Sequence, residues 1–228
     1  MLLGWPAPRS LVSASVLAAL VGCSSPEAVE GRVGATCKLA FVGSDAGSPE
    51  LVPGVAVDGG FVELGEGGAL PLATPPQGGH VSFVAARATN LDPCGVKLKA
   101  TVRSPRTGFI AAEEERTVTL SVADGGWAEA ELDDISNFAN VPMCPDYPPN
   151  ETLVDLPYDL EVRIVDRAGR TAHATRSIVP RCEQTEPYDR ALCRCECSEG
   201  YALGRCADPL DGGWLEVVDG GSPDAAAD

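Results

Sequence analysis

Cysteine is the residue type in this chain most able to do chemistry, because a thiol can form a disulfide, bind a metal ion or accept a covalent modification. Nine cysteines are distributed unevenly over 228 residues. The spacing is wide in the first two thirds of the chain, and five of the nine crowd into one short segment near the C-terminus. The nine are Cys23, Cys37, Cys94, Cys144, Cys182, Cys193, Cys195, Cys197 and Cys206.

The N-terminus has the parts of a secretory signal peptide. Arg9 precedes an apolar segment of 11 residues, Leu11 to Val21, which is followed by the small residue Gly22. This order of basic start, apolar segment and small residue is typical of an export signal. The apolar segment is well short of the roughly 20 residues that a membrane-spanning helix needs. We therefore interpret 1–22 as a cleaved leader and expect the rest of the chain to be exported.

The end of this leader, Leu20, Val21, Gly22 and Cys23, resembles the lipobox of bacterial lipoproteins. In that family the cysteine thiol receives a diacylglycerol, the leader is cut before it, and the new amine is acylated. The resemblance implies that Cys23 is the lipidation site, and several acyl chains would hold the protein stably at a membrane. By the same resemblance Ser24 favours the outer membrane over the inner one. The alternative is cleavage elsewhere, which would leave Cys23 as a structural thiol.

Eight cysteines remain if Cys23 carries lipid. An even set in an exported chain is what a disulfide framework requires, because thiols are oxidised outside the cytoplasm. If Cys182 belongs with the four cysteines that follow it, the body and the tail each hold an odd number, and at least one disulfide must join them. If Cys182, which ends an expected strand, belongs to the body, each part holds an even four and no such link is required.

The tail segment from Cys195 to Cys206 resembles the closing half of an EGF-like module, with its Cys-x-Cys-x-x-Gly-Tyr pattern followed by a further cysteine. The opening half does not fit, and the resemblance implies only one pair, Cys197 with Cys206. A thiolate metal site is the competing interpretation of this run. However, structural zinc sites usually place about two to four residues between paired cysteines, whereas a single residue separates Cys193 from Cys195. We therefore expect disulfides here and no metal ion.

Residues suited to catalysis are few. The only two histidines, His80 and His173, fall in expected strands, where an imidazole is more often a strand-face side chain than a base. The sequence contains no G-x-S-x-G elbow, H-E-x-x-H helix or phosphate-binding loop. Neighbouring carboxylates such as Asp133 and Asp134 lack the apolar flanks that would raise a pKa for acid catalysis. We expect a protein that is not an enzyme and binds no cofactor.

The charge of the chain excludes one class of partner. The formal net charge is −16, and the leader contributes a single basic residue, so the exported part is more acidic still. Such a surface repels phosphate backbones and anionic lipid head groups, and no cluster of Lys or Arg offsets it. Nucleic acid is therefore not expected as a partner.

Apolar and polar residues alternate through the middle of the chain, the period of half-buried strands. The clearest case is Val96 to Arg103, and further strands are expected around 81–85 and 118–122 and over 160–164 and 171–179. The last two are separated by a turn and predict a hairpin, and Asp124 to Gly126 predicts a tight turn. Shorter apolar runs in 36–70 predict edge strands. The one candidate helix, Leu132 to Ala139, is short.

This pattern predicts a mainly β chain, an antiparallel immunoglobulin-like β-sandwich with a small disulfide-rich C-terminal tail. The Cys, Trp and Cys signature of true immunoglobulin domains is missing, so the similarity is one of architecture and carries no function. We divide the chain into a lipoprotein signal peptide (1–22), a flexible tether (23–35), a β-sandwich domain (36–181), a cysteine-rich EGF-like segment (182–206) and an acidic disordered tail (207–228).

Three functions fit the sequence, and the chain as a whole resembles uncharacterised bacterial surface lipoproteins. The first is a non-enzymatic envelope lipoprotein, anchored through Cys23, whose loop 140–157 contacts an envelope protein or a polysaccharide. The second is a carbohydrate-binding module, which would need Trp127 exposed beside Tyr147 or Tyr158. The third is an extracytoplasmic hydrolase, which would need a pocket joining a histidine to an acid.

Overall fold

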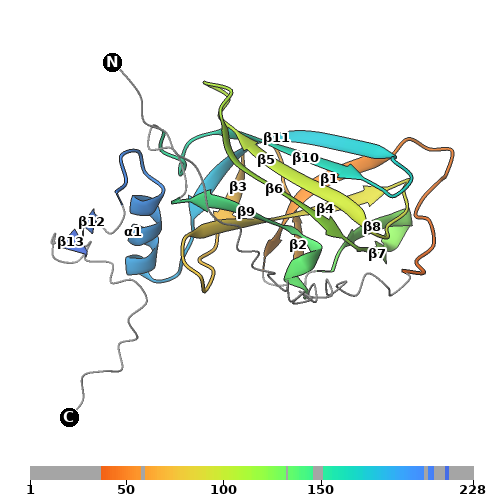
Figure 1. Ribbon diagram of the computed structural model, residues 1–228, viewed down its shortest axis with the longest axis horizontal. Coiled ribbons are helices and arrows are strands. Elements are labelled where there is room, and N and C mark those ends of the chain that lie inside the picture. Colours follow the sequence, from red (N-terminus) through yellow and green to blue (C-terminus); the bar gives the residue numbers. More distant parts are fainter. Residues whose placement is uncertain are drawn as a thin grey trace, which may run out of the picture. The chain divides into compact units, whose positions relative to one another are not determined.

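The structure, a computed structural model, describes residues 37–57, 60–131, 133–145, 151–202, 205–207 and 214–215. These residues lie in one compact unit that begins at Cys37. The expected signal peptide, Cys23, the tether and most of the acidic tail lie outside the described residues. The described part of the chain is mainly β, with two main sheets and one α-helix (Figure 1).

The first sheet is built around one long central strand, β4. Its strands follow the order β2-β1-β4-β8-β7, and β9 pairs with the first half of β4. All of its pairings are antiparallel. The six strands are β1 (Glu50–Val57), β2 (Gly60–Glu63), β4 (His80–Thr89), β7 (Leu120–Ala123), β8 (Trp127–Ala130) and β9 (Ala139–Cys144).

The second sheet has the order β3-β11-β10-β5-β6. The expected hairpin is confirmed, because β10 and β11 pair antiparallel along their length around a turn in which Asp166 accepts hydrogen bonds from two backbone N–H groups. One pairing departs from the antiparallel expectation, since β3 runs parallel to β11. The five strands are β3 (Gly68–Leu72), β5 (Val96–Arg103), β6 (Ile110–Val118), β10 (Tyr158–Val165) and β11 (Thr171–Cys182).

Both sheets contribute apolar side chains to a single core. The alternation in β5 is confirmed except at one position: Val96, Leu98, Ala100 and Val102 are all fully buried and Lys97 is exposed, but Thr101, expected on the outer face, is buried. The neighbouring β10 buries its own alternate residues against the same core. Removing this apolar area from water is the main force holding the two sheets together.

Three sequence expectations were wrong in detail. The segment 118–122 is not one strand: β6 ends at Val118 in one sheet and β7 begins at Leu120 in the other, so Val122 lies on an edge strand and is 58 % exposed. Strand β1 is internal, because β2 pairs with its outer edge. The described part of the expected helix, 133–139, holds a 3₁₀ turn instead, η2 (Ile135–Asn137), where Asp134 accepts a hydrogen bond from the backbone N–H of Ser136.

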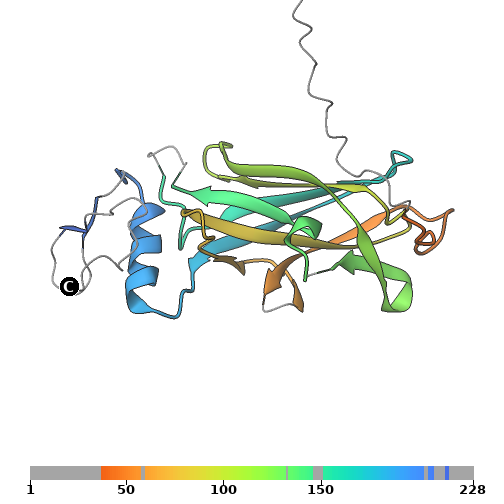
Figure 2. The same ribbon diagram turned by 60° about the horizontal axis from the view of Figure 1, so that its bottom comes forward.

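The compact unit has two distinct ends. Cys37 is disulfide-bonded to Cys94 between β4 and β5, and we call this the tether end. Helix α1 (Pro187–Glu196) follows β11 and contacts the start of β4, and we call this the cap end. The ten residues of β4 separate the two by about 30 Å, at ~3.3 Å per residue. Figures 1 and 2 show the orange N-terminal segment and the blue helix at opposite ends of the sheets.

Two short strands, β12 (Cys206–Ala207) and β13 (Trp214–Leu215), pair antiparallel beyond α1. The glycines of η1 (Asp124–Gly126) have positive φ angles of 73° and 78°, which confirms the tight turn expected there before β8. Glycine adopts a positive φ of this kind without the steric cost that a Cβ brings.

Candidate functional site

Helix α1 at the cap end is the largest element that the sequence analysis did not predict. Its N-terminus has Pro187 in the first turn with Asp189, and Arg194 lies in its last turn, an order of charges that favours the helix dipole. Within the helix only Cys193 is buried. An α-helix without a buried apolar stripe gains little from packing, so other contacts must hold it against the sheets.

Two disulfides provide that attachment. Cys193 and Cys197 lie four positions apart, which places them on the same side of the helix. Cys193 bonds to Cys182 at the end of β11, and Cys197 bonds to Cys144 at the end of β9. The tail is therefore linked covalently to the body. Because Cys182 ends β11 and so belongs to the body, each part holds four cysteines, and the even count did not require the link that these two disulfides make.

The pairing inferred from the EGF-like resemblance, Cys197 with Cys206, was wrong. Cys206 bonds instead to Cys195, and the expected EGF-like segment contains the ten-residue helix α1. The physical reason is the helix itself: it turns Cys193 and Cys197 toward the sheets, whereas Cys195, two residues from each, lies on another side and pairs with the strand that follows. All eight cysteines from Cys37 onward are thus paired in four disulfides.

His80, the first residue of β4, lies between these two disulfides and is 2 % exposed. Its Nε2 lies 2.7 Å from Oε2 of Glu196 in α1, and its Nδ1 lies 3.2 Å from Oγ1 of Thr74. Gly79 precedes it with φ +71°, and a Cβ at that position would approach the Cys144 carbonyl oxygen to 3.0 Å. The glycine therefore allows the close approach of backbone that brings His80 beside Cys144.

This arrangement joins a histidine to an acid, the feature that a hydrolase would require. However, both ring nitrogens of His80 already have protein partners, and the ring is almost fully buried. His173 is different, since it is exposed on β11 opposite Arg163 of β10. The geometry of His80 is that of a polar contact between body and cap.

A second polar cluster lies at the same end of the sheets, on the segment that follows residue 150. The carboxylate of Glu151 is buried, accepts a hydrogen bond from Thr107 at 3.0 Å and lies 3.2 Å from the Arg106 guanidinium. Burial alone would raise the pKa of this carboxyl, but hydrogen bonds from Ser104, Arg106 and Thr107 outweigh it and hold the pKa below its usual value. The cluster fixes the β5–β6 turn against this segment.

The expected contact loop 140–157 is only partly a loop. Its first residues form β9, and 146–150 lie outside the described residues. In the remainder Leu153 is fully buried and donates its backbone N–H to the carbonyl of Cys197, whereas Leu156 is 46 % exposed. A small cavity of about 190 Å³ lies beside Glu151, lined also by Arg106 and Leu156. The loop therefore supports the cap as well as facing solvent.

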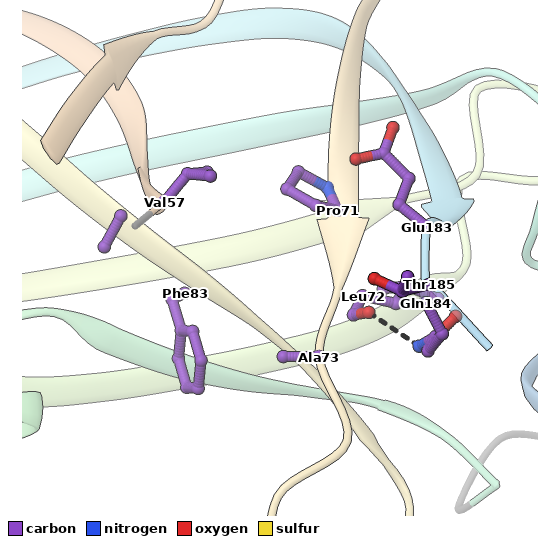
Figure 3. A pocket seen from close by; sticks show the side chains of 9 residues that line it. Val57, Pro71, Leu72, Ala73, Phe83, Glu183, Gln184 and Thr185 are labelled. Carbon is purple, nitrogen blue, oxygen red and sulfur yellow. Dashed lines mark hydrogen bonds between the residues drawn. The ribbon is translucent and has the colours of Figure 1, made fainter. Parts of the chain in front are cut away.

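A hollow of about 500 Å³ lies beside β4, where β1 ends its pairing with that strand and Ala73, the residue after β3, forms a bridge to Val81 (Figure 3). Val57 and Phe83 line it on one side of β3, and the residues that follow β11 line it on the other. The Gln184 side-chain amide donates a hydrogen bond to the Leu72 carbonyl at 2.9 Å and so closes that side. The lining residues are Ala56, Val57, Pro71, Leu72, Ala73, Phe83, Glu183, Gln184 and Thr185.

Two of the aromatic residues proposed for sugar binding, Trp127 and Tyr158, lie in different sheets. Trp127 lies in β8 with the Arg87 guanidinium over its ring, 5.5 Å from the ring centre. Tyr158 begins β10 in the other sheet and is 2 % exposed, and Tyr147 lies outside the described residues. Stacking on a sugar requires an open aromatic face, and Arg87 lies over one face of Trp127.

No protein-family model matches this chain, and no curated protein matches it either. Of the helices in the described ranges, none has the length and apolar content needed to cross a bilayer. Function must therefore be argued from the disulfides, the two ends and the contacts between them.

Proposed function

We propose that this chain is a membrane-anchored, non-enzymatic lipoprotein of the bacterial cell envelope. It is attached to the outer membrane through lipidated Cys23, and its body is an interaction or structural module for an envelope protein or a polysaccharide. One observation carries the proposal: every cysteine from Cys37 to Cys206 is in a disulfide, so that only Cys23 is left over. Disulfides persist outside the cytoplasm, and the leftover cysteine is the one in the lipobox.

The body in this proposal is an immunoglobulin-like β-sandwich. Two sheets that share one core and a long hairpin, β10–β11, support this description. The parallel pairing of β3 with β11 and the absence of a disulfide between the two sheets' central strands distinguish it from true immunoglobulin domains.

In this proposal the tether end and the cap end of the body have different roles. A tether of 13 residues, 23–35, would lead to the start of the body, where the Cys37–Cys94 disulfide fixes the entry point. The cap end lies about 30 Å away along β4. With the tether end attached to the membrane, the cap end is free to meet a partner.

Incorporation of radiolabelled palmitate by cells that express the chain tests the anchor. Wild type should be labelled and Cys23→Ala should not, because acylation needs the thiol and the amine of that residue. The double variant Cys37→Ala, Cys94→Ala is the matched control, since it also lacks cysteines but keeps the lipobox, and it should be labelled like wild type. Label retained in Cys23→Ala, or absent from wild type, would contradict the proposal.

A further inference from the structure

The sulfur atoms at the cap end surround a buried imidazole. The Sγ atoms of Cys193 and Cys197 and a ring nitrogen of His80 all lie within 4.8 Å of one another. Each sulfur is bonded to a further one, that of Cys182 or Cys144. All five side chains are at most 7 % exposed. Four sulfurs and one nitrogen are thus gathered in a small, dry volume.

The spacing of the two helical cysteines matches that of a zinc site. Three residues separate Cys193 from Cys197, within the range of about two to four that structural zinc sites use. The single residue between Cys193 and Cys195 is too short a spacing for a zinc site. The helix shows that this was the wrong pair, because Cys195 bonds away from the cluster to Cys206.

Glu196 strengthens this correspondence. Its carboxylate lies 2.7 Å from Nε2 of His80, with 12 % of the side chain exposed. In metal sites a ligating histidine commonly donates its second ring N–H to a carboxylate, which fixes the orientation and tautomer of the ring and raises its basicity. In such a site Nε2 of His80 would face Glu196, and Nδ1 would be the ligand in place of its 3.2 Å contact with Thr74.

We propose that the thiol form of this cluster binds one zinc ion through Cys193, Cys197, His80 and one of the two cysteines bonded to them here, Cys144 or Cys182. A thiol reductant would supply two electrons and two protons to each disulfide and leave as its own disulfide. Zinc would then displace the protons of the three coordinating thiols, which bind as thiolates. The disulfide and zinc states exclude each other, so that the cap is held either by two cross-links or by one metal ion.

This state would exist before the exported chain is oxidised, or wherever a thiol reductant reaches it. Zinc suits the site because it accepts nitrogen and sulfur ligands in a closed tetrahedral set. A hard oxygen-preferring cation such as Mg²⁺ does not suit it, because sulfur and nitrogen are not its preferred ligands.

The test uses the purified full chain, either oxidised or reduced with a phosphine, titrated with Co²⁺ as a spectroscopic probe and then with Zn²⁺ in competition. Reduced wild type should bind one equivalent with a thiolate-to-cobalt charge-transfer band, and oxidised wild type should bind none. Glu196→Gln should weaken zinc binding by about tenfold to a hundredfold, as loss of a histidine-orienting group does. His80→Gln should change the cobalt spectrum and weaken binding further.

The matched control is the double variant Cys195→Ser, Cys206→Ser, which removes a disulfide from the same tail but none of the ligands. It should bind zinc like wild type after reduction. The circular dichroism of each oxidised variant shows whether it folds. If His80→Gln does not fold, Glu196→Gln still tests the proposal. No charge-transfer band in the reduced wild type, or equal weakening in the control and in Glu196→Gln, would overturn the proposal.

Discussion

The body and the cap end of this protein are held together by different forces. The body buries apolar residues from both sheets in one core, and its own disulfide, Cys37–Cys94, lies at the tether end. Helix α1 buries one residue, Cys193, and is held by two disulfides and the His80–Glu196 contact. Covalent bonds can thus replace apolar burial where a segment is too small and polar to form a core.

The two regions should accordingly respond to different substitutions. Loss of a cross-link should release the cap and leave the sheets folded, whereas loss of a core side chain should weaken the sheets. The segment that begins at Glu151 lies between the two, since Leu153 contacts Cys197 and Glu151 contacts the β5–β6 turn.

The largest effect is expected from the double variant Cys144→Ser, Cys197→Ser. This disulfide spans 53 residues, and the chain-entropy model assigns such a loop about 4 kcal/mol. A helix of ten residues is too short to persist alone in water, so the amide protons of α1 should lose most of their protection from hydrogen exchange. The amide protons of β10 and β5 should keep theirs.

Removal of Cys195–Cys206 by serine substitutions is the matched control, since that disulfide lies in the same tail but does not reach the sheets. It should leave the protection of α1 in place. If both double variants release α1 equally, the cap is not held by its link to Cys144.

The second largest effect on stability is expected from a core substitution, Leu98→Ala in β5. Leu98 is fully buried in the core, and truncating such a side chain costs about 2–5 kcal/mol because it leaves a cavity. The urea unfolding midpoint should fall accordingly. Leu192→Ala in α1 is the counterpart: Leu192 is not part of the core cluster, and the loss should be below about 1 kcal/mol. Equal losses would show that α1 shares the core of the body.

The smallest expected effect is on the stability of the fold at low pH. Burial opposes ionisation of Glu151, but its hydrogen bonds outweigh burial and hold the pKa below the ordinary value of 4.5. A carboxyl whose pKa is lower in the folded state than in the unfolded state stabilises the fold at any pH above the unfolded-state pKa. This contribution disappears as the pH falls through the folded-state pKa. When the pH is lowered from about 6 to about 3, the free energy of unfolding measured with urea should therefore fall less for Glu151→Gln than for wild type. Glu115→Gln, at an exposed position on β6, should behave like wild type.

The strands could be predicted from the sequence because their apolar residues alternate. Leu160, Val162 and Ile164 show this pattern, and all three are fully buried. Strand β3 was not predicted, because a short run such as Gly-Ala-Leu-Pro-Leu has no clear period, and its parallel partner β11 lies more than a hundred residues away.

The cap could be predicted only in part. The cysteine count indicated a disulfide between body and tail only if Cys182 belonged to the tail, whereas Cys182 ends β11 in the body. The partners depend on which side of α1 each cysteine occupies. The helix has a polar composition, only ten residues and a single buried side chain, so its apolar face was too short for periodicity to reveal it. Pro187 followed by Asp189, and cysteines at positions 193 and 197, were the available signals. The contact between His80 and Glu196 joins residues 116 apart, and no local pattern predicts it.

Mass spectrometry of the protein extracted from its native membranes, alkylated without reduction and then digested, tests the proposed function most directly. We expect an N-terminal peptide that begins at acylated Cys23, a peptide pair joined by Cys144–Cys197, and no alkylated cysteine. A mature chain with an unmodified N-terminus, or an alkylated thiol among the other eight cysteines, would contradict the proposal of a lipid-anchored protein with a disulfide-linked cap.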